Sequence, residues 1–235
     1  MSVHQFAEKV ALVSDGASEI GRAVALQLAL QGCYVIVGFS SANEQTKSAL
    51  TELKNLGTLA HAVETDCATV EGARGLVAEV EKLYGRLDIL VNCLKLKGDS
   101  SFQEIEEDAW TKSVNANLKA NFFVTQAAVN LMRARPKARI VNVVFDCAAD
   151  ENDLAFAMTQ AGIISLTELL AKQLAPKFRV NAVKIGERKT MAVENLDAEL
   201  FRPPSGIAFD DAARAILFLL SSEAVGLNGQ ILTVG

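Results

Sequence analysis

Short apolar runs rich in β-branched residues alternate with longer amphipathic segments from one end of the chain to the other. Apolar residues recur at helical spacing in the longer segments, which therefore predict helices, whereas the short runs predict strands. Runs such as 10–13 and 140–144 are almost wholly apolar, as expected for strands buried on both faces of a sheet. The predicted strands cover residues 9–14, 34–37, 59–63, 87–92, 139–144, 179–183 and 230–234, and the predicted helices cover 20–30, 42–56, 69–83, 106–132, 154–174 and 210–220.

Strands that alternate with crossover helices predict an α/β fold: a doubly wound, seven-stranded parallel sheet of Rossmann-like type with helices on both faces. The 235 residues suffice for one large core, so we expect a single domain over residues 1–235. In such a sheet the ligand crevice lies beyond the carboxyl ends of the strands. The loops after the first, second, fourth and fifth predicted strands are therefore the candidate functional segments.

Charge and hydropathy argue against two classes of partner. The net charge is −5 and the 23 lysines and arginines are scattered, so the basic patch that nucleic-acid binding needs is lacking. The start of the chain lacks the apolar core of a signal peptide, and the apolar run at 215–220 is too short to span a bilayer. We expect a cytoplasmic protein that binds neither nucleic acid nor a membrane.

The cysteines and histidines favour neither a metal centre nor a disulfide. No two cysteines form a Cys-x-x-Cys pair, and each lies in an apolar or strand-like stretch. Buried, reduced thiols are therefore favoured over disulfides or metal ligands. The two histidines likewise have no partner at metal-ligand spacing. The residues concerned are Cys33, Cys67, Cys93, Cys147, His4 and His61.

Several segments match, in order and at spacing, the motifs of one enzyme family. Residues 9–25, K-V-A-L-V-S-D-G-A-S-E-I-G-R-A-V-A, resemble the opening of the short-chain dehydrogenases/reductases. The resemblance implies the Rossmann-like fold, whereas activity must be judged from the site residues. It continues through scaffold segments at 85–92, 117–128, 138–144, 161–171, 179–183 and 228–234.

The turn after the first strand departs from the family's cofactor motif. Family members bind NAD or NADP with T-G-x-x-x-G-I-G, whose glycines let backbone N–H groups approach the pyrophosphate. Here Ser14 replaces the threonine, Asp15 and Glu19 replace two glycines, and Ile20 and Gly21 are retained. A carboxylate about 4 Å from a phosphate oxygen is repelled by about 4 kcal/mol at an effective dielectric constant of ~20. We therefore expect this chain to bind no dinucleotide.

Other positions that the family uses for the cofactor also differ. Gly16 could restore the glycine turn one residue late, although both carboxylates would remain. Residues 38–40 offer neither the acid that binds the ribose of NAD nor the base that binds the extra phosphate of NADP. Asp66 matches the acid beside the adenine, but a turn or cap role explains it equally well. Residues 92–95, Asn-Cys-Leu-Lys, stand where the family has N-N-A-G.

The residues that carry hydride transfer in the family are replaced here, with one exception. The resemblance implies an acid/base Tyr, a Lys that lowers its pKa, a Ser that holds the carbonyl and an Asn that holds a proton-relay water. Phe156, Gln160 and Phe145 occupy the Tyr, Lys and Ser positions. Asn117 is retained, and it could equally bond the backbone of a kinked helix. A phenyl ring has no proton to donate and a neutral amide cannot lower a pKa by charge, so we expect no catalytic residues.

Nearby polar residues could in principle substitute for the missing groups, but a solvated loop is favoured for the acidic run at 146–153. Lys95, Lys97 and Lys184 could bind an anion or simply be solvated. The segment 187–208, the substrate lid in the family, is short and contains two prolines, which agrees with a lost substrate. The alternative acid/base candidates are Asp146, Asp150, Glu151, Asp153 and Thr159.

The framework is kept while the site residues are lost together, which favours a function carried by the surface. In the family, subunits pair through the helices that correspond to 106–132 and 153–175, and through the last helix and strand. The first of these helices is crowded with apolar residues, including Phe122, Phe123, Ala127, Val129 and Met132.

The first hypothesis is a catalytically inactive subunit that stabilises an active, NAD-dependent short-chain dehydrogenase paralogue in a hetero-oligomer. Heteromeric members such as the 2-(hydroxybenzyl)succinyl-CoA dehydrogenases contain one degenerate subunit, which this chain resembles. NAD(H) would then be held by the active partner, acting on a hydroxyacyl or oxoacyl substrate of the acyl-CoA type. One alternative is an oxidoreductase with rewired residues. The other is a homo-oligomeric ligand sensor whose emptied crevice is lined by Phe39, Leu94, Phe145 and Phe156.

Overall fold

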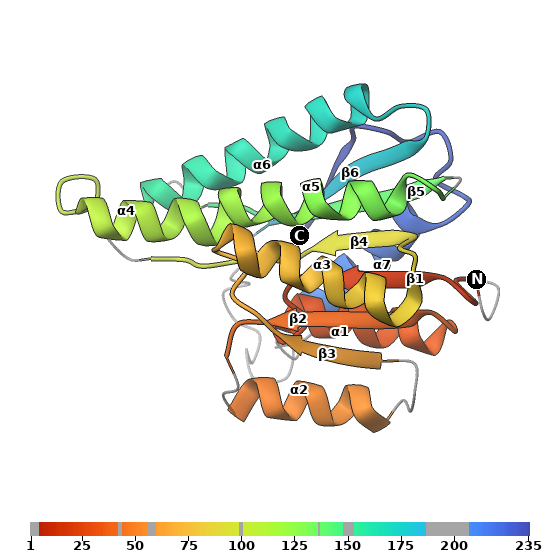
Figure 1. The fold of residues 1–235 in the computed structure, drawn as a ribbon. Helices are drawn as coiled ribbons and strands as arrows, with labels where there is room; N and C mark the ends of the chain where they lie inside the picture. Colours follow the sequence, from red (N-terminus) through yellow and green to blue (C-terminus); the bar gives the residue numbers. More distant parts are fainter. Residues whose placement is uncertain are drawn as a thin grey trace, which may run out of the picture.

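The computed structural model describes residues 5–41, 44–55, 60–98, 101–135, 137–147, 153–186 and 207–235. Its seven strands form one parallel sheet in the order β3-β2-β1-β4-β5-β6-β7 (Figure 1). The strands are β1 (Val10–Val13), β2 (Tyr34–Phe39), β3 (Ala60–Glu64), β4 (Ile89–Asn92), β5 (Ala138–Phe145), β6 (Phe178–Ile185) and β7 (Ile231–Val234). The helices are α1 (Glu19–Leu30), α2 (Glu44–Asn55), α3 (Val70–Tyr84), α4 (Glu107–Val114), α5 (Ala120–Met132), α6 (Leu154–Gln173) and α7 (Ile207–Leu220). The predicted fold class is confirmed.

The middle strands of the sheet are buried along their whole length. Every residue of β1 and β4 is buried, and β1 pairs in parallel with both β2 and β4. Strands β5 and β6 pair over their full length, from Ala138 opposite Phe178 to Phe145 opposite Ile185. Side chains on both faces of these strands enter a core, which explains the continuous apolar runs in the sequence.

Two helical layers cover the two faces of the sheet. On one face α1 packs beside α7, and residues such as Leu28 and Ile216 contribute to its core. On the other face α3 packs beside α5, with Leu76 and Val124 in a second core. Helix α2 lies beside the edge strand β3 (Figure 1). The sheet thus separates two hydrophobic cores, as a doubly wound fold requires.

Side-chain caps fix where the helices start at the carboxyl edge of the sheet. Ser18 precedes α1, and its hydroxyl accepts a hydrogen bond from the N–H of Gly21 at 3.2 Å. Thr69 does the same for α3 through the N–H of Gly72 at 3.0 Å. At the opposite end of α3, Gly85 has a φ of +61°, a conformation that ends the helix and favours glycine. The caps hold the turns after β1 and β3 at the edge where the crevice was expected.

The single helix predicted over 106–132 is interrupted in the structure. A π-helical turn over Asn115–Lys119 separates α4 from α5. The Asn117 side chain donates a hydrogen bond to the carbonyl oxygen of Ser113 at 2.9 Å, and Asn121 bonds the carbonyl of Asn117 at 3.0 Å. Such side-chain bonds to the backbone accompany the wider turn, and they are not visible in the apolar periodicity.

Within the described ranges, α6 is long and apolar enough to cross a membrane by length and composition. Polar residues such as Thr159, Gln160 and Glu168 interrupt its apolar positions, so this helix contains no long uninterrupted apolar run. The helix packs along β5 and β6, and Phe156 and Ile163 on its inner side are buried. Burial in the core accounts for 39% of this apolar window, and one such helix is weak evidence for a membrane span.

Candidate functional site

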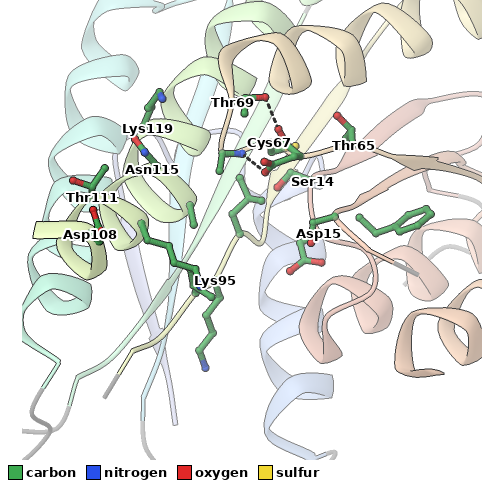
Figure 2. A pocket seen from close by; sticks show the side chains of 18 residues that line it. Ser14, Asp15, Thr65, Cys67, Thr69, Lys95, Asp108, Thr111, Asn115 and Lys119 are labelled. Atoms are coloured by element: carbon green, nitrogen blue, oxygen red, sulfur yellow. Dashed lines mark hydrogen bonds between the residues drawn. The ribbon is translucent and has the colours of Figure 1, made fainter. Parts of the chain in front are cut away.

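A cleft of about 790 Å³ opens at the carboxyl edge of the sheet. Its walls come from the segments that follow β1, β2, β3 and β4 and from α4 with the π-helical turn. Figure 2 shows Asp108, Thr111 and Asn115 of this helical wall on one side and Asp15 on the other. The expected position of the crevice is therefore confirmed for the exits of the first, second and fourth strands.

The turn between β1 and α1 satisfies its polar groups with its own side chains. The Ser18 hydroxyl donates to the carbonyl oxygen of Asp15 at 2.7 Å and caps the Gly21 N–H. A Cβ at Gly21 would lie 1.8 Å from that same carbonyl oxygen, so only glycine fits there. Glu19 occupies the first turn of α1, where its carboxylate complements the helix dipole. These groups occupy the helix end that a bound phosphate would otherwise use.

Asp15 is the most perturbed carboxyl group at this edge. Burial raises the pKa of Asp15 to about 6, while hydrogen bonds from the backbone of Ser18 and Ala17 partly oppose the increase. Within the described part of the chain, no lysine or arginine forms an ion pair with Asp15. Because a pKa of about 6 lies below neutral pH, the group is still mainly charged at pH 7.

Gly16 has a packing role that leaves its N–H unavailable to a phosphate. A Cβ at Gly16 would lie 2.3 Å from the Cβ of Val37, so the backbone of the turn lies directly against β2. The Gly16 N–H donates to the carbonyl oxygen of Gly38 at 3.0 Å. The partial rescue of the glycine turn considered above is therefore not supported, because this donor is already used.

Asp66 has the turn role that the sequence offered as one explanation. Its carboxylate accepts a hydrogen bond from the N–H of Ala68 at 2.9 Å, which makes it a turn residue before α3. It also lines the cleft, as do Phe39 and Leu94. A further stripe of cleft residues was missed. Thr111, Asn115 and Lys119 recur every four residues, a polar period that could have indicated a crevice-facing side of a partly apolar helix.

The three replaced catalytic positions lie together in the interior rather than on the cleft wall. Phe145 and Phe156 belong to the core shared with α1 and α7, and the side chain of Phe156 is 1% exposed. Gln160 is 3% exposed, and its side-chain oxygen accepts the N–H of Phe145 at 2.9 Å. Neither phenylalanine is among the described residues that line this cleft, and both rings contribute to the core. Phe39 and Leu94 do line it.

Asn117 binds the loop after β4 to the helical wall. Its side chain is fully buried, and its amide group donates to the carbonyl oxygen of Leu96 at 2.8 Å. Its oxygen accepts the Leu96 N–H, also at 2.8 Å. On the other side of the loop, the Asp153 carboxylate accepts hydrogen bonds from the N–H groups of Gly98 and Phe156. The retained Asn thus has the backbone-bonding role that the sequence left open, and it shapes the cleft.

We expect Asn117→Ala to loosen the loop after β4. The change leaves the partly buried N–H and C=O groups of Leu96 without their partner, so local opening becomes easier. Hydrogen exchange of the Leu96 amide should accelerate about tenfold, while exchange in β6 stays unchanged. Equal acceleration in both places would show that Asn117 acts on global stability rather than on the loop.

The other candidate residues, for anion binding or acid/base chemistry, do not gather at one site, and several interact with other side chains or with the backbone. Lys184 forms an ion pair with Asp146 at 2.8 Å, and the Lys95 ammonium lies 4.2 Å from the centre of the Phe145 ring. Thr159 is buried and donates to the carbonyl oxygen of Phe156. Asp150, Glu151, Pro203, Pro204 and residues 187–206 lie outside the described residues.

The structure gives no indication of a metal centre in the described segments, where no three metal-ligating side chains cluster. His61 contacts the ring of Tyr84 instead, with ring centres 5.9 Å apart. Cys33, Cys67 and Cys93 are buried, Cys147 is partly buried, and all four are free thiols. The expectation of buried reduced thiols is confirmed for three of the four. His4 lies outside the described residues.

The parallel sheet, the crevice at its carboxyl edge and the capped turn after β1 define a doubly wound, Rossmann-like α/β protein. A family model described as short chain dehydrogenase matches residues 9–200. The chain belongs to the short-chain dehydrogenase family.

Relatives of known name cover nearly the whole chain. It is 30% identical over 236 residues to the 3-oxoacyl-(acyl-carrier-protein) reductase FabG of Staphylococcus aureus strain Mu50, with 96% of each protein covered. It is 33% identical to the reductase of the same name from Thermotoga maritima, again with 96% of each covered. The solved structure of a short chain dehydrogenase from Mycobacterium smegmatis superposes with a TM-score of 0.83 at 25% identity, covering 99% of this chain and 93% of that one.

Proposed function

We propose that this chain is a non-catalytic subunit that assembles with an active, NAD-dependent short-chain dehydrogenase. The observation that carries the proposal is the burial and hydrogen bonding of the side chains at the three replaced catalytic positions. Phe145, Phe156 and Gln160 are buried, and a hydrogen bond joins Gln160 to the backbone of Phe145. None of them offers an acid, a base or a nucleophile to the cleft.

The cofactor belongs to the active partner in this proposal. The residues of the β1–α1 turn do not fit a pyrophosphate, because Asp15 and Glu19 stand where backbone donors are needed and both repel an anion. The named relatives are 3-oxoacyl reductases, which supports a partner that acts on a hydroxyacyl or oxoacyl thioester, such as an acyl-CoA. We place the assembly in the cytoplasm.

Exposed apolar side chains support an assembly surface on the two predicted helical segments. Helices α4, α5 and α6 expose large apolar residues where a monomer would leave them in water. Val129 and Met132 do not belong to this surface, because both are buried against the sheet. At the last strand, Leu232 is also exposed, which supports the C-terminal contact. The exposed residues on the three helices are Trp110, Phe122, Leu154, Met158 and Leu169.

Native mass spectrometry of the protein from its own host tests the assembly. We expect a mixed oligomer with two subunit masses, and we expect the chain purified alone to bind no NAD(H) by calorimetry. A single subunit mass, together with NAD(H) bound to this chain, would refute the proposal. Phe122→Glu adds a charge to the exposed surface of α5 and should dissociate the mixed oligomer. Arg133→Glu, at the exposed residue that directly follows α5, provides the control.

A restoration series separates the loss of the cofactor turn from the loss of the proton donor. Phe145→Ser, Phe156→Tyr and Gln160→Lys together should not produce hydride transfer, because Asp15 and Glu19 still exclude the pyrophosphate. Adding Asp15→Gly and Glu19→Gly should be required for any turnover, followed by NADH absorbance. Turnover by the triple variant alone would show that the turn still accepts the cofactor.

The open cleft favours one second candidate, a homo-oligomeric ligand sensor. A cleft of about 790 Å³ is large enough for a small molecule, and Phe39 and Leu94 contribute apolar surface to it. A ligand retained through purification, in an oligomer of a single mass, would favour this candidate. Hydride transfer by the chain alone would instead favour an oxidoreductase with rewired residues.

A further inference from the structure

The edge of the sheet opposite the cleft concentrates positive charge. Strands β1, β4, β5 and β6 are neighbours in the sheet, and at this edge the chain enters them through residues 5–9, 85–88, 133–139 and 174–179 (Figure 1). These segments contain eight lysines and arginines and two acidic residues, whereas the whole chain has 28 acidic and 23 basic residues. The bases are far apart in the sequence, and only the parallel sheet brings them to one edge. Residue 136 lies outside the described residues, and we call the rest of this surface the basic edge.

The acidic residues of the basic edge offset only part of its charge. The Asp88 carboxylate accepts hydrogen bonds from the Nε and Nη2 groups of Arg86 at 3.0 and 2.8 Å. It also lies 3.4 Å from the Arg135 Nε and 3.8 Å from the Lys9 Nζ. Glu8 is exposed, and its charge acts on Arg86 as well. The two carboxylates therefore interact with the same few bases and leave the others uncompensated.

Four bases that reach solvent at this edge form no ion pair with a described residue. Three of them, Arg133, Lys137 and Lys177, are exposed. The fourth, Arg139, is partly exposed and lies opposite Arg179 in the register of β5 and β6, and its Nε has no hydrogen-bond partner in the described part of the chain. Burial and the charge of Arg179 lower the pKa of Arg139 to about 10. A carboxylate at this edge would offset the repulsion between the two guanidinium groups.

The size of the basic edge decides which kind of anion it fits. Four strands spaced about 4.8 Å apart span about 15 Å, the length of about four or five extended residues. A nucleic-acid site neutralises about six to ten phosphates, more than the unpaired bases here can contact. Beyond the edge the surface is acidic on balance, because the whole chain carries a net charge of −5. A long polyanion or a membrane would meet that negative surface, whereas a short acidic segment would not.

We infer that the basic edge docks a short acidic segment of a partner protein. Carboxylates of this segment would pair with Lys137, Arg139 and Lys177, and the guanidinium fork of Arg139 matches the geometry of a carboxylate. Complementary charge of this kind accelerates association and selects the partner. The inference rests on charge at the amino ends of the strands, and not on the exposed apolar side chains of α4, α5 and α6. It therefore does not depend on pairing with an active paralogue.

A fluorescein-labelled hexaglutamate peptide tests the inference on the purified full chain. Fluorescence anisotropy at low salt should show saturable binding of the peptide. Lys137→Glu combined with Lys177→Glu should weaken the affinity at least about tenfold, because two attractions become repulsions. Raising the salt concentration to about 0.15 M should weaken binding to the parent chain as well, since exposed charges are screened.

Arg74→Glu combined with Lys112→Glu is the matched control. Both residues are exposed, and they lie towards the carboxyl edge of the sheet, Arg74 near the start of α3 and Lys112 on the cleft wall. The control has the same net charge as the test variant, so it separates local charge from total charge. It should change the affinity for the peptide by less than about twofold.

Three results would overturn the inference. They are the lack of saturable peptide binding, equal weakening by the two double variants, and tighter binding of a uridine oligonucleotide or of phosphatidylserine vesicles than of the peptide. The last result would make the partner a nucleic acid or a membrane. The subunit masses in the native assembly are a separate measurement, so failure here leaves the proposed subunit role untouched.

Discussion

Gln160→Lys, which restores the lysine of the family, should destabilise this chain by about 4 kcal/mol. Gln160 is 3% exposed, and its oxygen accepts the N–H of Phe145, a bond that a lysine cannot make. The new ammonium would lie in the interior beside Phe145, without a carboxylate to pair it among the bonds that Gln160 makes. Urea unfolding followed by circular dichroism measures the loss.

Two further variants show which part of this cost comes from the charge. Gln160→Met removes the acceptor without adding a charge and should cost about 2 kcal/mol, the penalty of an orphaned buried N–H. Gln173→Lys is the same replacement at the exposed end of the same helix and should change stability by less than about 0.5 kcal/mol. If Gln160→Lys were as stable as the parent, position 160 would be accessible to water. The side chain at this replaced catalytic position would then not be enclosed in the interior.

Asp15→Asn should stabilise the chain by up to about 3 kcal/mol at pH 7.5. The variant keeps an oxygen that can accept the backbone hydrogen bonds but removes the charge that burial disfavours. Each unit of pKa corresponds to about 1.4 kcal/mol, and the pKa rises from 3.8 in the reference state to about 6 in the fold. Urea unfolding at several pH values measures the gain.

The stability gained through Asp15→Asn should decrease as the pH falls. The folded chain binds the proton more tightly than the unfolded chain, so the charged carboxylate lowers stability above pH 6. As the pH falls from about 6 towards 3.8, the folded carboxyl group becomes neutral and the advantage of Asn disappears. Glu19→Gln, an exposed carboxylate in the same turn, is the control and should slightly destabilise α1. A gain from Asp15→Asn that persists at pH 4 would contradict this explanation.

The stabilisation expected from removing Asp15 also bears on its role. A residue that costs stability is informative when it lies in a cleft, because uncompensated charge is common at sites that bind a ligand. Asp15 lines the cleft. The expected cost of this carboxylate comes from a charge held partly out of water, which the hydrogen bonds from the backbone of Ser18 and Ala17 offset only in part.

Much of the site could be located from the sequence because the fold determines where strand exits lie. Ser14, Asp15, Asp66, Leu94 and Lys95 were all expected at the crevice and all line the cleft. The rings of Phe145 and Phe156 were also expected there, whereas in the structure both contribute to the core. Sequence position fixes which strand end or helix carries a residue, but the direction in which an aromatic ring packs depends on the neighbouring elements, here the core with α1 and α7.

The order of apolar runs and helical patterns by itself determined the seven-stranded α/β fold, because strands buried on both faces and crossover helices leave few arrangements. Only the tertiary structure decided three features. They are the hydrogen bond between Gln160 and Phe145, the hydrogen bonding of Asn117 to the backbone of Leu96, and the burial that raises the pKa of Asp15. These three features join residues that are distant in sequence or depend on the surrounding protein. Burial and long-range hydrogen bonds are properties of the packed chain, so local sequence patterns do not contain them.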